Sequence, residues 1–348
     1  MIKLLKDFDW NKNDSIPEEY KDNANVEQLK RNKLPIIKDL CTLFKALNLE
    51  YSDLKWLFFS NGRKDFLYYK MNISKKNGGK RELQIPNDKL MTIQKAINRA
   101  LLNKIRLSEN CVGFVKNKSI VTNAEKHIGA KVLLKFDIKD FFSSIKFYQV
   151  YKQFRFLGYG EKVAKCLTMI CVDSSGSLPQ GAPTSPTLSN IVCFKLDKRI
   201  ANFCSNQNLI YTRYADDITI SSLTVLDKKK INFIKKIIIK IINEEGFESN
   251  PEKLNVIYSN SRMEVTGIVV NKKLSVKKEV IREVENAIRY IKKYGLENHL
   301  DHIQCDKTNY VGHIYGLVSY IHMIDKKKAQ KLLIELDEMK LQEESYYG

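Results

Sequence analysis

Apolar positions along this chain follow two periods, which predict short strands set among longer helices. Helical spacing begins at Pro35 and continues to Leu49, and it returns in a basic segment from Asp227 to Glu245. Runs of β-branched and aromatic residues predict strands instead, because these side chains pack well on a pleated surface. Further helices are expected over residues 51–60, 88–107, 147–157, 162–171 and from Pro186 to about residue 206, with strands over 66–69, 81–85, 131–136, 209–214, 218–222, 254–258, 264–270 and 274–276. This mixture indicates an α+β fold with helices packed around a sheet.

The same pattern divides the chain into three parts. Residues 1–60 form a predicted N-terminal helical extension, whose first 33 residues are polar and irregular. Residues 61–270 mix strands and helices, and residues 271–348 are helical, as expected for a separate lobe. The longest apolar segment, Ile231–Ile242, is interrupted by three lysines, so no stretch approaches the ~18 residues of a membrane span. We expect a cytoplasmic protein without a membrane partner.

Acidic residues stand at the ends of predicted apolar strands. Asp137 follows the strand over 131–136, and Asp216 and Asp217 lie in the turn between two short β runs. A carboxylate beside buried strands is costly unless it is solvated, paired or bound to metal. Mg²⁺ relieves the repulsion among such groups and prefers a few carboxylates together with phosphate oxygens. The pattern therefore suggests a metal site, although two adjacent aspartates also occur in ordinary polar turns.

Composition adds a polyanionic partner to this picture. Lys and Arg total 59 against 40 Asp and Glu, which gives a formal net charge of +19. Basic side chains bind nucleic acid mainly by neutralising phosphates, whereas a merely basic protein is the ordinary alternative. The seven cysteines form no Cys-x-x-Cys pair, so we expect reduced thiols and no zinc site. His299 and His302 have no further ligands nearby in sequence and are expected to be structural.

Three segments together resemble reverse transcriptases. Residues 214–217, Tyr-Ala-Asp-Asp, resemble the Tyr-x-Asp-Asp box, residues 137–142 resemble the first palm motif, and residues 178–186 resemble the loop between them. They occur in the family's order and at family-like spacing. The resemblance implies a right-hand polymerase fold with fingers, a palm whose antiparallel sheet carries the catalytic aspartates, and a helical thumb. The catalytic residues, which would also hold two Mg²⁺ ions that Mn²⁺ could replace, would be Asp137, Asp216 and Asp217.

The resemblance also implies a binding site for dNTPs. Phe142 would stack under the deoxyribose and exclude a 2′-hydroxyl, although Phe141 beside it could serve instead. Gln180 and Gly181 would lie near the incoming nucleotide and the template, where glycine allows close backbone approach. Three basic residues would meet the triphosphate or the leaving group, namely Lys80, Arg81 and Lys253. The ordinary alternatives are a core phenylalanine and a solvated basic loop.

Two shorter signatures resemble those of retron reverse transcriptases in sequence and in placement. Residues 123–127, Asn-Ala-Glu-Lys-His, match their Asn-Ala-x-x-His element, and residues 265–267 match their Val-Thr-Gly element. Without the resemblance, His127 would be read as a histidine at a helix terminus, and residues 265–267 as an ordinary strand and turn. The resemblance implies RNA binding by Asn123, His127, Val265, Thr266 and Gly267.

Membership of the retron family would imply a specific task and specific partners. Such enzymes bind a structured non-coding RNA encoded beside them, prime from the 2′-hydroxyl of an internal guanosine and copy part of that RNA. The branched RNA–DNA product, called msDNA, stays bound, and many such systems add an effector protein and act in anti-phage defence. About 80 residues follow Gly267, which is too few for an RNase H domain, so template removal would need host RNase H.

The segment after Asn271 fits a role in duplex binding. Between Asn271 and Lys293, eight basic residues stand against three acidic ones. One helix face could follow the phosphates of a duplex, or it could be an ordinary solvated face. The predicted RNA contacts there are Lys277, Lys278, Arg282 and Arg289. Two other functions stay open: a non-catalytic nucleoprotein scaffold for an effector, and a reverse transcriptase of the abortive-infection or diversity-generating lineages.

Overall fold

A four-stranded antiparallel sheet forms the centre of the molecule. The computed structural model describes residues 22–49, 67–74, 78–303 and 310–347, so the helix expected over 51–60 lies outside the described residues. The strands of the sheet occur in the order β4 (Ile210–Tyr214), β5 (Asp217–Ser222), β3 (Val132–Asp137) and β6 (Asn255–Tyr258). All four lie where the sequence pattern placed them, and the expected α+β class is confirmed.

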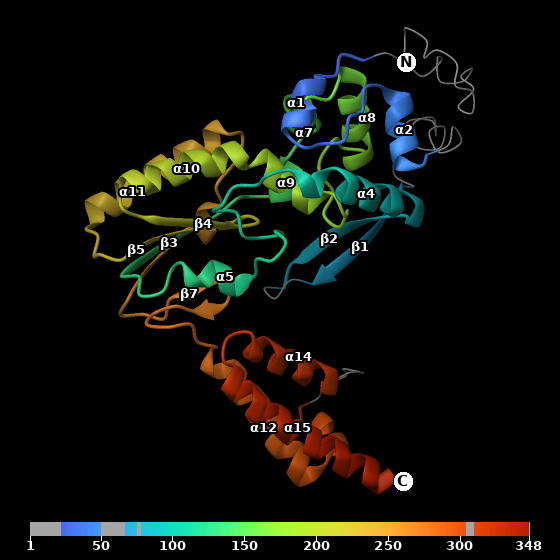
Figure 1. Cartoon of the computed structure of the whole chain (residues 1–348). Coiled ribbons are helices and arrows are strands. Elements are labelled where there is room, and N and C mark those ends of the chain that lie inside the picture. The colour runs from blue at the N-terminus through green and yellow to red at the C-terminus, as the bar shows by residue number, and fades with distance from the viewer. Residues whose placement is uncertain (1–21, 50–66, 75–77, 304–309, 348) are drawn as a thin grey trace.

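Both faces of the central sheet are buried, which explains the continuous apolar runs of its strands. α10 (Phe194–Asn206) and α11 (Lys228–Glu244) cover one face (Figure 1). Along β3, Leu134 and Phe136 belong to the main core on that side, whereas Leu133 belongs to a smaller core on the other side. The smaller core lies beneath α5 (Ile120–Glu125), so β3 is held between two separate apolar layers.

The main core extends from the sheet into a group of helices and a hairpin. The helices are α1 (Val26–Arg31), α2 (Leu40–Leu47), α4 (Asp88–Ala100), α6 (Phe141–Ser144), α7 (Phe147–Leu157), α8 (Glu161–Cys171) and α9 (Ser185–Val192), with the 3₁₀ turns η4 (Leu102–Lys104) and η5 (Pro251–Lys253). The strands expected over 66–69 and 81–85 form a hairpin, in which β1 (Tyr68–Ser74) pairs with β2 (Lys80–Pro86). It projects beside α4 with most of its residues exposed (Figure 1).

Two helices near the N-terminus differ from the sequence pattern. The helix expected from Pro35 begins only at Leu40, because the Asp39 side chain caps its first turn. α1 lies in a stretch expected to be irregular, and its cap is the side chain of Asn25. A short polar helix of this kind has too few apolar positions to show a helical period in the sequence. Its stability comes from tertiary packing, which the sequence pattern does not report.

Two further helices were predicted too long. The helix expected over 88–107 ends at Ala100, and the side chain of Asn87 caps its N-terminus. The helix expected after Pro186 is two helices, α9 and α10, which meet at Cys193. Apolar periodicity continues through both breaks because the flanking segments face the same core, so the sequence pattern did not reveal them.

A small hairpin replaces the strand expected over residues 264–270. It consists of β7 (Glu264–Val265) and β8 (Ile268–Val269), and it packs against α5. Thr266 and Gly267 form its turn, with positive φ angles of 47° and 86°. The strand expected over 274–276 is reduced to one bridge between Ser275 and Val269.

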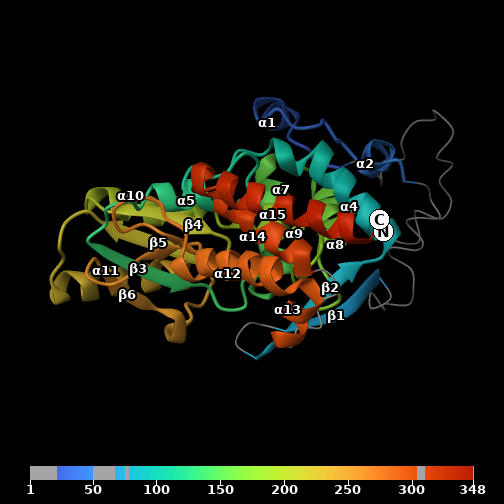
Figure 2. The ribbon, with the colours of Figure 1, turned by 90° about the horizontal axis from the view of Figure 1, so that it is seen from below.

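The C-terminal helices form a lobe with an apolar core of its own. The lobe consists of α12 (Lys278–Tyr294), α13 (Leu296–His302), α14 (Tyr310–His322) and α15 (Lys326–Tyr347). It projects from the side of the molecule where β7 lies, and α12, α14 and α15 lie side by side (Figures 1 and 2). Ile324 packs against both the lobe core and the small core beneath the sheet. His299 is buried and forms a 3.0 Å hydrogen bond with Tyr310. Within the described ranges, no helix has the length and apolar character to cross a membrane.

Candidate active site

The central sheet brings the three predicted carboxylates to one of its ends. Asp137, the last residue of β3, lies opposite Asp217, the first residue of β5, in the antiparallel register. Asp216 precedes β5, and its carbonyl accepts a 3.1 Å hydrogen bond from the amide of Ile138. These contacts tie the two strand ends together. Asp137 and Asp216 line a cleft of about 560 Å³.

Negative charge accumulates at this end of the sheet. Burial, together with the charge of Asp217, raises the pKa of Asp216 to about 6. Desolvation also raises the pKa of Asp217, and the charge of Asp137 contributes in the same direction. The Asp137 carboxylate is buried and accepts a 2.7 Å hydrogen bond from Lys253 Nζ. Both pKa values stay raised although Lys253 lowers them and Lys135 also lowers that of Asp217. The lysines therefore do not offset burial and the repulsion among the carboxylates, a situation that a cation relieves.

The donor set of the site suits a hard divalent cation. Carboxylate oxygens from Asp137, Asp216 and Asp217 are ligands that Mg²⁺ prefers. In the part of the chain that the structure describes, no three acidic, histidine or cysteine side chains converge closely enough to hold an ion by themselves. Phosphate oxygens of a nucleotide would therefore have to complete the coordination, as is usual for Mg²⁺. Lys253 would also have to release Asp137.

Two aromatic rings stand beside the carboxylates. Phe142 is half-buried, and its ring centroid lies 6.1 Å from that of Phe114. Phe141 also reaches the cleft, but it is buried and packs against Phe247 at 6.4 Å. The geometry therefore favours Phe142 over Phe141 as the residue that meets a bound nucleotide.

Phe114 is a residue that sequence reasoning missed. It lines the cleft with 45% of its surface exposed, and its ring lies 6.4 Å from that of Tyr214. Its φ of 60° is rare for a bulky side chain. Strained, exposed conformations of this kind occur mainly at functional sites. Neither spacing nor charge marks this residue in the sequence, because its position depends on the fold of its loop.

The opposite wall of the cleft comes from β2 and from the loop that carries Gln180. Lys80 and Arg81 are exposed and line the cleft together with Gln180. The amide of Gln84 donates a 2.8 Å hydrogen bond to the carbonyl of Gln180. Gly181 does not line the cleft, but its φ is 127° and a Cβ there would lie 2.9 Å from the carbonyl oxygen of Gln84. Glycine is therefore what lets this loop lie against β2.

Known relatives cover almost the whole of this chain. The family model described as "Reverse transcriptase (RNA-dependent DNA polymerase)" matches residues 73–315. The retron Ec86 reverse transcriptase of Escherichia coli is 33% identical over 327 residues, which cover 93% of this chain and 95% of that protein. This chain belongs to the retron reverse transcriptases. The resemblance recognised in the sequence is confirmed, and the enzyme is an RNA-directed DNA polymerase of a family that depends on divalent metal.

This reverse transcriptase also matches a second curated retron enzyme and a solved structure. The retron Mx65 reverse transcriptase of Myxococcus xanthus is 30% identical, over 94% of this chain and 76% of that protein. Among solved structures, a telomerase from Candida albicans in complex with a fragment of telomeric RNA aligns with a TM-score of 0.45 at 12% identity. The alignment covers 79% of the reverse transcriptase and 63% of the telomerase, so this chain spans less than two thirds of that protein.

The two retron signatures lie away from the cleft of this reverse transcriptase and pack against each other. Asn123 and His127 are fully buried, and the His127 ring is hydrogen-bonded to Ser221 at 2.7 Å and Thr212 at 2.8 Å. Burial lowers the pKa of His127 to about 3, so this ring is neutral. In this position neither Asn123 nor His127 presents its side chain to a bound RNA. Their predicted RNA contacts stay a prediction, and the structure gives both residues a place inside the fold.

The second signature forms the turn of the β7–β8 hairpin. Val265 is buried, and Thr266 Oγ1 donates a 3.0 Å hydrogen bond to the carbonyl of Ile120 in α5. The carbonyl of Gly267 accepts a 3.1 Å hydrogen bond from Tyr320 of α14. The Val-Thr-Gly turn thus joins the sheet region of the reverse transcriptase to its C-terminal lobe, and its predicted role in RNA binding is untested.

The predicted basic face is present on α12 of the reverse transcriptase. Lys278, Arg282 and Arg289 are exposed, and their spacing places them within about 40° around the helix axis. Buried residues of α12, such as Val284 and Ile291, lie on the opposite side. Lys277 differs, because it is half-buried and paired with Glu264. The three exposed residues therefore form a stripe that faces away from the lobe core.

Proposed function

We propose that this reverse transcriptase copies part of a cognate structured non-coding RNA, starting from the 2′-hydroxyl of an internal guanosine. The product would be a 2′,5′-branched RNA–DNA hybrid, msDNA, that stays bound to the enzyme. The observation that carries the proposal is the placement of Asp137, Asp216 and Asp217 at one end of the central sheet, beside a cleft that Asp137 and Asp216 line, in a chain whose relatives are retron reverse transcriptases. Synthesis of this hybrid would serve an anti-phage defence system together with an effector protein.

The proposed architecture is that of a right-hand polymerase. The β1–β2 hairpin would act as part of the fingers, and the central sheet would act as the palm. Together these elements belong to a proposed fingers and palm domain over residues 61–270. Residues 271–348 would form the thumb, and residues 1–60 an N-terminal extension. The exposed basic stripe of α12 supports a duplex-binding role for the thumb.

The proposed mechanism assigns each cleft residue one task. Asp137, Asp216 and Asp217 would hold two Mg²⁺ ions, which Mn²⁺ could replace. When bound, the ions would lower the pKa of the attacking hydroxyl and neutralise the leaving pyrophosphate. Lys80 and Arg81 would bind the triphosphate of the dNTP from the hairpin side, and Lys253 would move from Asp137 to the phosphates. These tasks are mainly positioning and charge neutralisation, which supply most of the catalysis in phosphoryl transfer.

The remaining residues of the cleft would select the substrate. Phe142 would occupy the space of a ribose 2′-hydroxyl, and the loop with Gln180 and Gly181 would support the template and the incoming nucleotide. Retained msDNA would lie along the thumb, and host RNase H would remove the copied template. The signatures around His127 and Gly267 would recognise the RNA through the surfaces that they position.

Primer extension tests the polymerase site directly. Purified enzyme should extend a labelled primer on an RNA template with dNTPs and Mg²⁺, and Asp216→Asn or Asp217→Asn should abolish extension because either change removes a metal ligand. Undiminished synthesis by either variant would refute the assignment of the carboxylates.

Co-purifying nucleic acid tests the retron task. Nucleic acid extracted from the enzyme should contain a discrete short DNA that is released from RNA by a debranching enzyme. If nothing co-purifies, or the DNA carries no branch, the proposed priming is wrong. If Asp216→Asn abolishes synthesis but leaves anti-phage protection intact, the main function is a nucleoprotein scaffold instead.

A further inference from the structure

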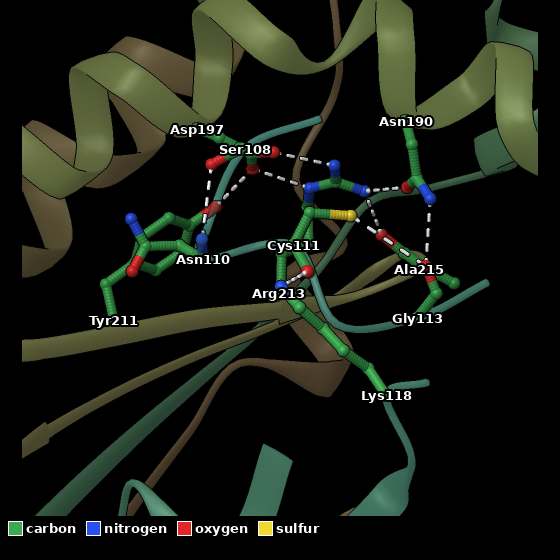
Figure 3. Close-up of polar contacts among 10 residues, drawn as sticks. All are labelled: Ser108, Asn110, Cys111, Gly113, Lys118, Asn190, Asp197, Tyr211, Arg213 and Ala215. Atoms are coloured by element: carbon green, nitrogen blue, oxygen red, sulfur yellow. Dashed lines mark hydrogen bonds and ion pairs between the residues drawn. The ribbon is translucent and has the colours of Figure 1, made fainter. Parts of the chain in front are cut away.

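A fully buried charged network lies directly behind the aspartate turn (Figure 3). Its centre is Arg213 in β4, whose side chain has no exposed surface. The guanidinium makes a two-pronged ion pair with Asp197 of α10, at 2.7 Å from Nε and 2.8 Å from Nη2. Tyr211 donates a 2.6 Å hydrogen bond to the same carboxylate. Burial lowers the pKa of Arg213, but the Asp197 charge outweighs this and holds it well above its usual value.

The third arm of the guanidinium reaches the turn that carries Asp216. Arg213 Nη1 donates to the carbonyl of Ala215 at 3.0 Å and to the side-chain oxygen of Asn190 at 3.1 Å. Ala215 has a φ of 56°, a left-handed conformation that an alanine rarely adopts. The Arg213 hydrogen bond holds the carbonyl of this strained residue, which immediately precedes Asp216.

Asn190 extends the network to the loop that carries Phe114. Its side-chain amide donates a 2.8 Å hydrogen bond to the carbonyl of Gly113. A Cβ at Gly113 would lie only 2.6 Å from the amide nitrogen of Ala215, so the loop and the aspartate turn are in direct backbone contact. One buried arginine therefore reaches two segments beside the cleft, the Asp216 turn through Ala215 and the Phe114 loop through Asn190.

Backbone hydrogen bonds continue this connection along the edge of β4. The amide of Val112 donates to the carbonyl of Arg213 at 2.8 Å, and the amide of Arg213 donates to the carbonyl of Asn110 at 2.9 Å. Lys118 Nζ closes the loop by donating to the carbonyl of Cys111 at 2.7 Å. Phe114 lies at the far end of this braced segment, where its ring enters the cleft.

Folding stability alone does not explain such a network. A buried ion pair is often no more stabilising than well-packed apolar residues of similar volume, because both charges lose their water. The network does supply donors in a fixed plane, which arginine offers and lysine does not. Those donors are directed at the Ala215 carbonyl and the Asn190 side chain, which contact the Asp216 turn and the Phe114 loop. The distinctive feature of the network is therefore the geometry of its hydrogen bonds rather than their energy.

We propose that Arg213 is a positioning residue for polymerisation, which holds the Asp216 turn and the Phe114 loop in register with each other. The proposal rests on the proposed role of Asp216 in catalysis. Arg213 does not reach the cleft itself and acts through Ala215 on one side and Asn190 on the other.

Arg213→Lys and Asn190→Ala test this role together. Arg213→Lys keeps the charge beside Asp197 but loses the fork, and Asn190→Ala removes the link to Gly113 without leaving a buried charge unpaired. We expect kcat to fall by up to about 100-fold in Arg213→Lys, since a displacement of about 1 Å at a reacting group can cost that much. The Mg²⁺ concentration for half-maximal activity should rise in both variants, while duplex affinity stays within about twofold.

Amide hydrogen exchange gives a readout that is independent of activity. In both variants, amides at residues 111–115 and 214–217 should exchange faster than in the unmodified enzyme, because these segments lose hydrogen bonds of the Arg213 network. Exchange in α12 should be unchanged. Arg199→Lys is the matched control, since this half-buried arginine of α10 pairs with Glu244 and Glu245 at the end of α11 and has no hydrogen bond or ion pair with the described residues of the Arg213 network. It should behave as the unmodified enzyme in every measurement.

The outcomes separate this proposal from the proposed function. If both folded variants keep the unmodified kcat, Mg²⁺ dependence and exchange pattern, Arg213 is not a positioning residue. If Arg213→Lys does not fold, Asn190→Ala decides by the same criteria. If the unmodified enzyme extends no primer, the proposed function fails, and exchange at residues 111–115 and 214–217 still decides whether Arg213 holds the two segments.

Discussion

At the scale of single residues, Asp216 shows how strongly the site is charged. Burial and the charge of Asp217 raise its pKa to about 6, against an ordinary value of 3.8. The folded enzyme therefore holds this proton to higher pH than the unfolded chain does. In the absence of metal, the free energy of unfolding should fall as pH rises from about 4 to 6, and the full penalty should be present above that range.

Asp216→Asn should stabilise the metal-free enzyme while abolishing polymerisation. The substitution removes the buried charge, so at pH 7.5 in EDTA the free energy of unfolding should increase by about 2 kcal/mol, and the gain should vanish near pH 4. Thermal unfolding at several pH values measures it. Asp301→Asn, on the exposed surface of α13, is the control and should leave unfolding unchanged. A destabilised Asp216→Asn at pH 7.5 would contradict the charge balance described here.

Phe142→Val should relax sugar selection. A smaller side chain leaves room for a 2′-hydroxyl, so rNTP incorporation should rise relative to dNTP incorporation by about 10- to 100-fold, the range expected for a few missing carbons in a pocket. Single-nucleotide insertion kinetics measure this ratio. Phe156→Val, at a 74% exposed position on α7, should not change it. If Phe141→Val changes the ratio and Phe142→Val does not, the neighbouring phenylalanine is the selecting residue.

At the scale of elements, the cleft depends on how β2 meets the loop with Gln180. The hairpin is otherwise mostly exposed, and the Gln84–Gln180 backbone hydrogen bond joins it to the loop. Gly181 makes this approach possible, because any Cβ would press on the Gln84 carbonyl. The contact between these two parts of one cleft wall thus rests on one residue without a side chain.

Gly181→Ala should weaken dNTP binding as well as folding. The positive φ alone should lower the free energy of unfolding by about 1–3 kcal/mol. The contact of the new Cβ with Gln84 should also push the loop away from β2 and raise KM for dNTPs. Thermal unfolding and steady-state kinetics measure the two effects. Gly129 also has a positive φ, of 75°, but open space around its Cβ, so Gly129→Ala should lose stability and keep its KM. Equal KM values in both variants would rule out the role given to the loop contact.

At the scale of the whole molecule, the C-terminal lobe contacts the β7–β8 hairpin and the small core beneath the sheet. Tyr320 reaches the Gly267 carbonyl, and Ile324 packs on both cores. The exposed stripe on α12 is directed away from the lobe core. This arrangement provides a basic surface on a lobe that is anchored at the retron signature.

Replacing Lys278, Arg282 and Arg289 with glutamine should weaken duplex binding in a salt-dependent way. Each lost phosphate contact should reduce the slope of log affinity against log salt by about 1. Filter binding of an RNA–DNA duplex at several salt concentrations measures the slope. Lys240→Gln on α11, whose lysine pairs with Glu244, is the control and should keep the slope. An unchanged slope in the triple variant would show that duplex does not lie on this face.

The sequence by itself determined the strands next to Asp137, Asp216 and Asp217, the turn between β4 and β5 and the family of the enzyme. It could do so because apolar periodicity and short motifs are local properties, and each is complete within a few residues. It also anticipated Phe142, Arg81 and Lys253 at one cleft, but only through resemblance.

Tertiary structure alone decided the rest. The breaks at Ala100 and Cys193, the β7–β8 turn and the burial of His127 depend on which surfaces meet, and periodicity does not report that. Phe114 and the Arg213 network were invisible for the same reason, because Asp197 and Arg213 stand 16 residues apart on different elements. The sequence shows a charged residue such as Arg213 within an apolar strand, but only the fold brings Asp197 beside it to form a buried ion pair.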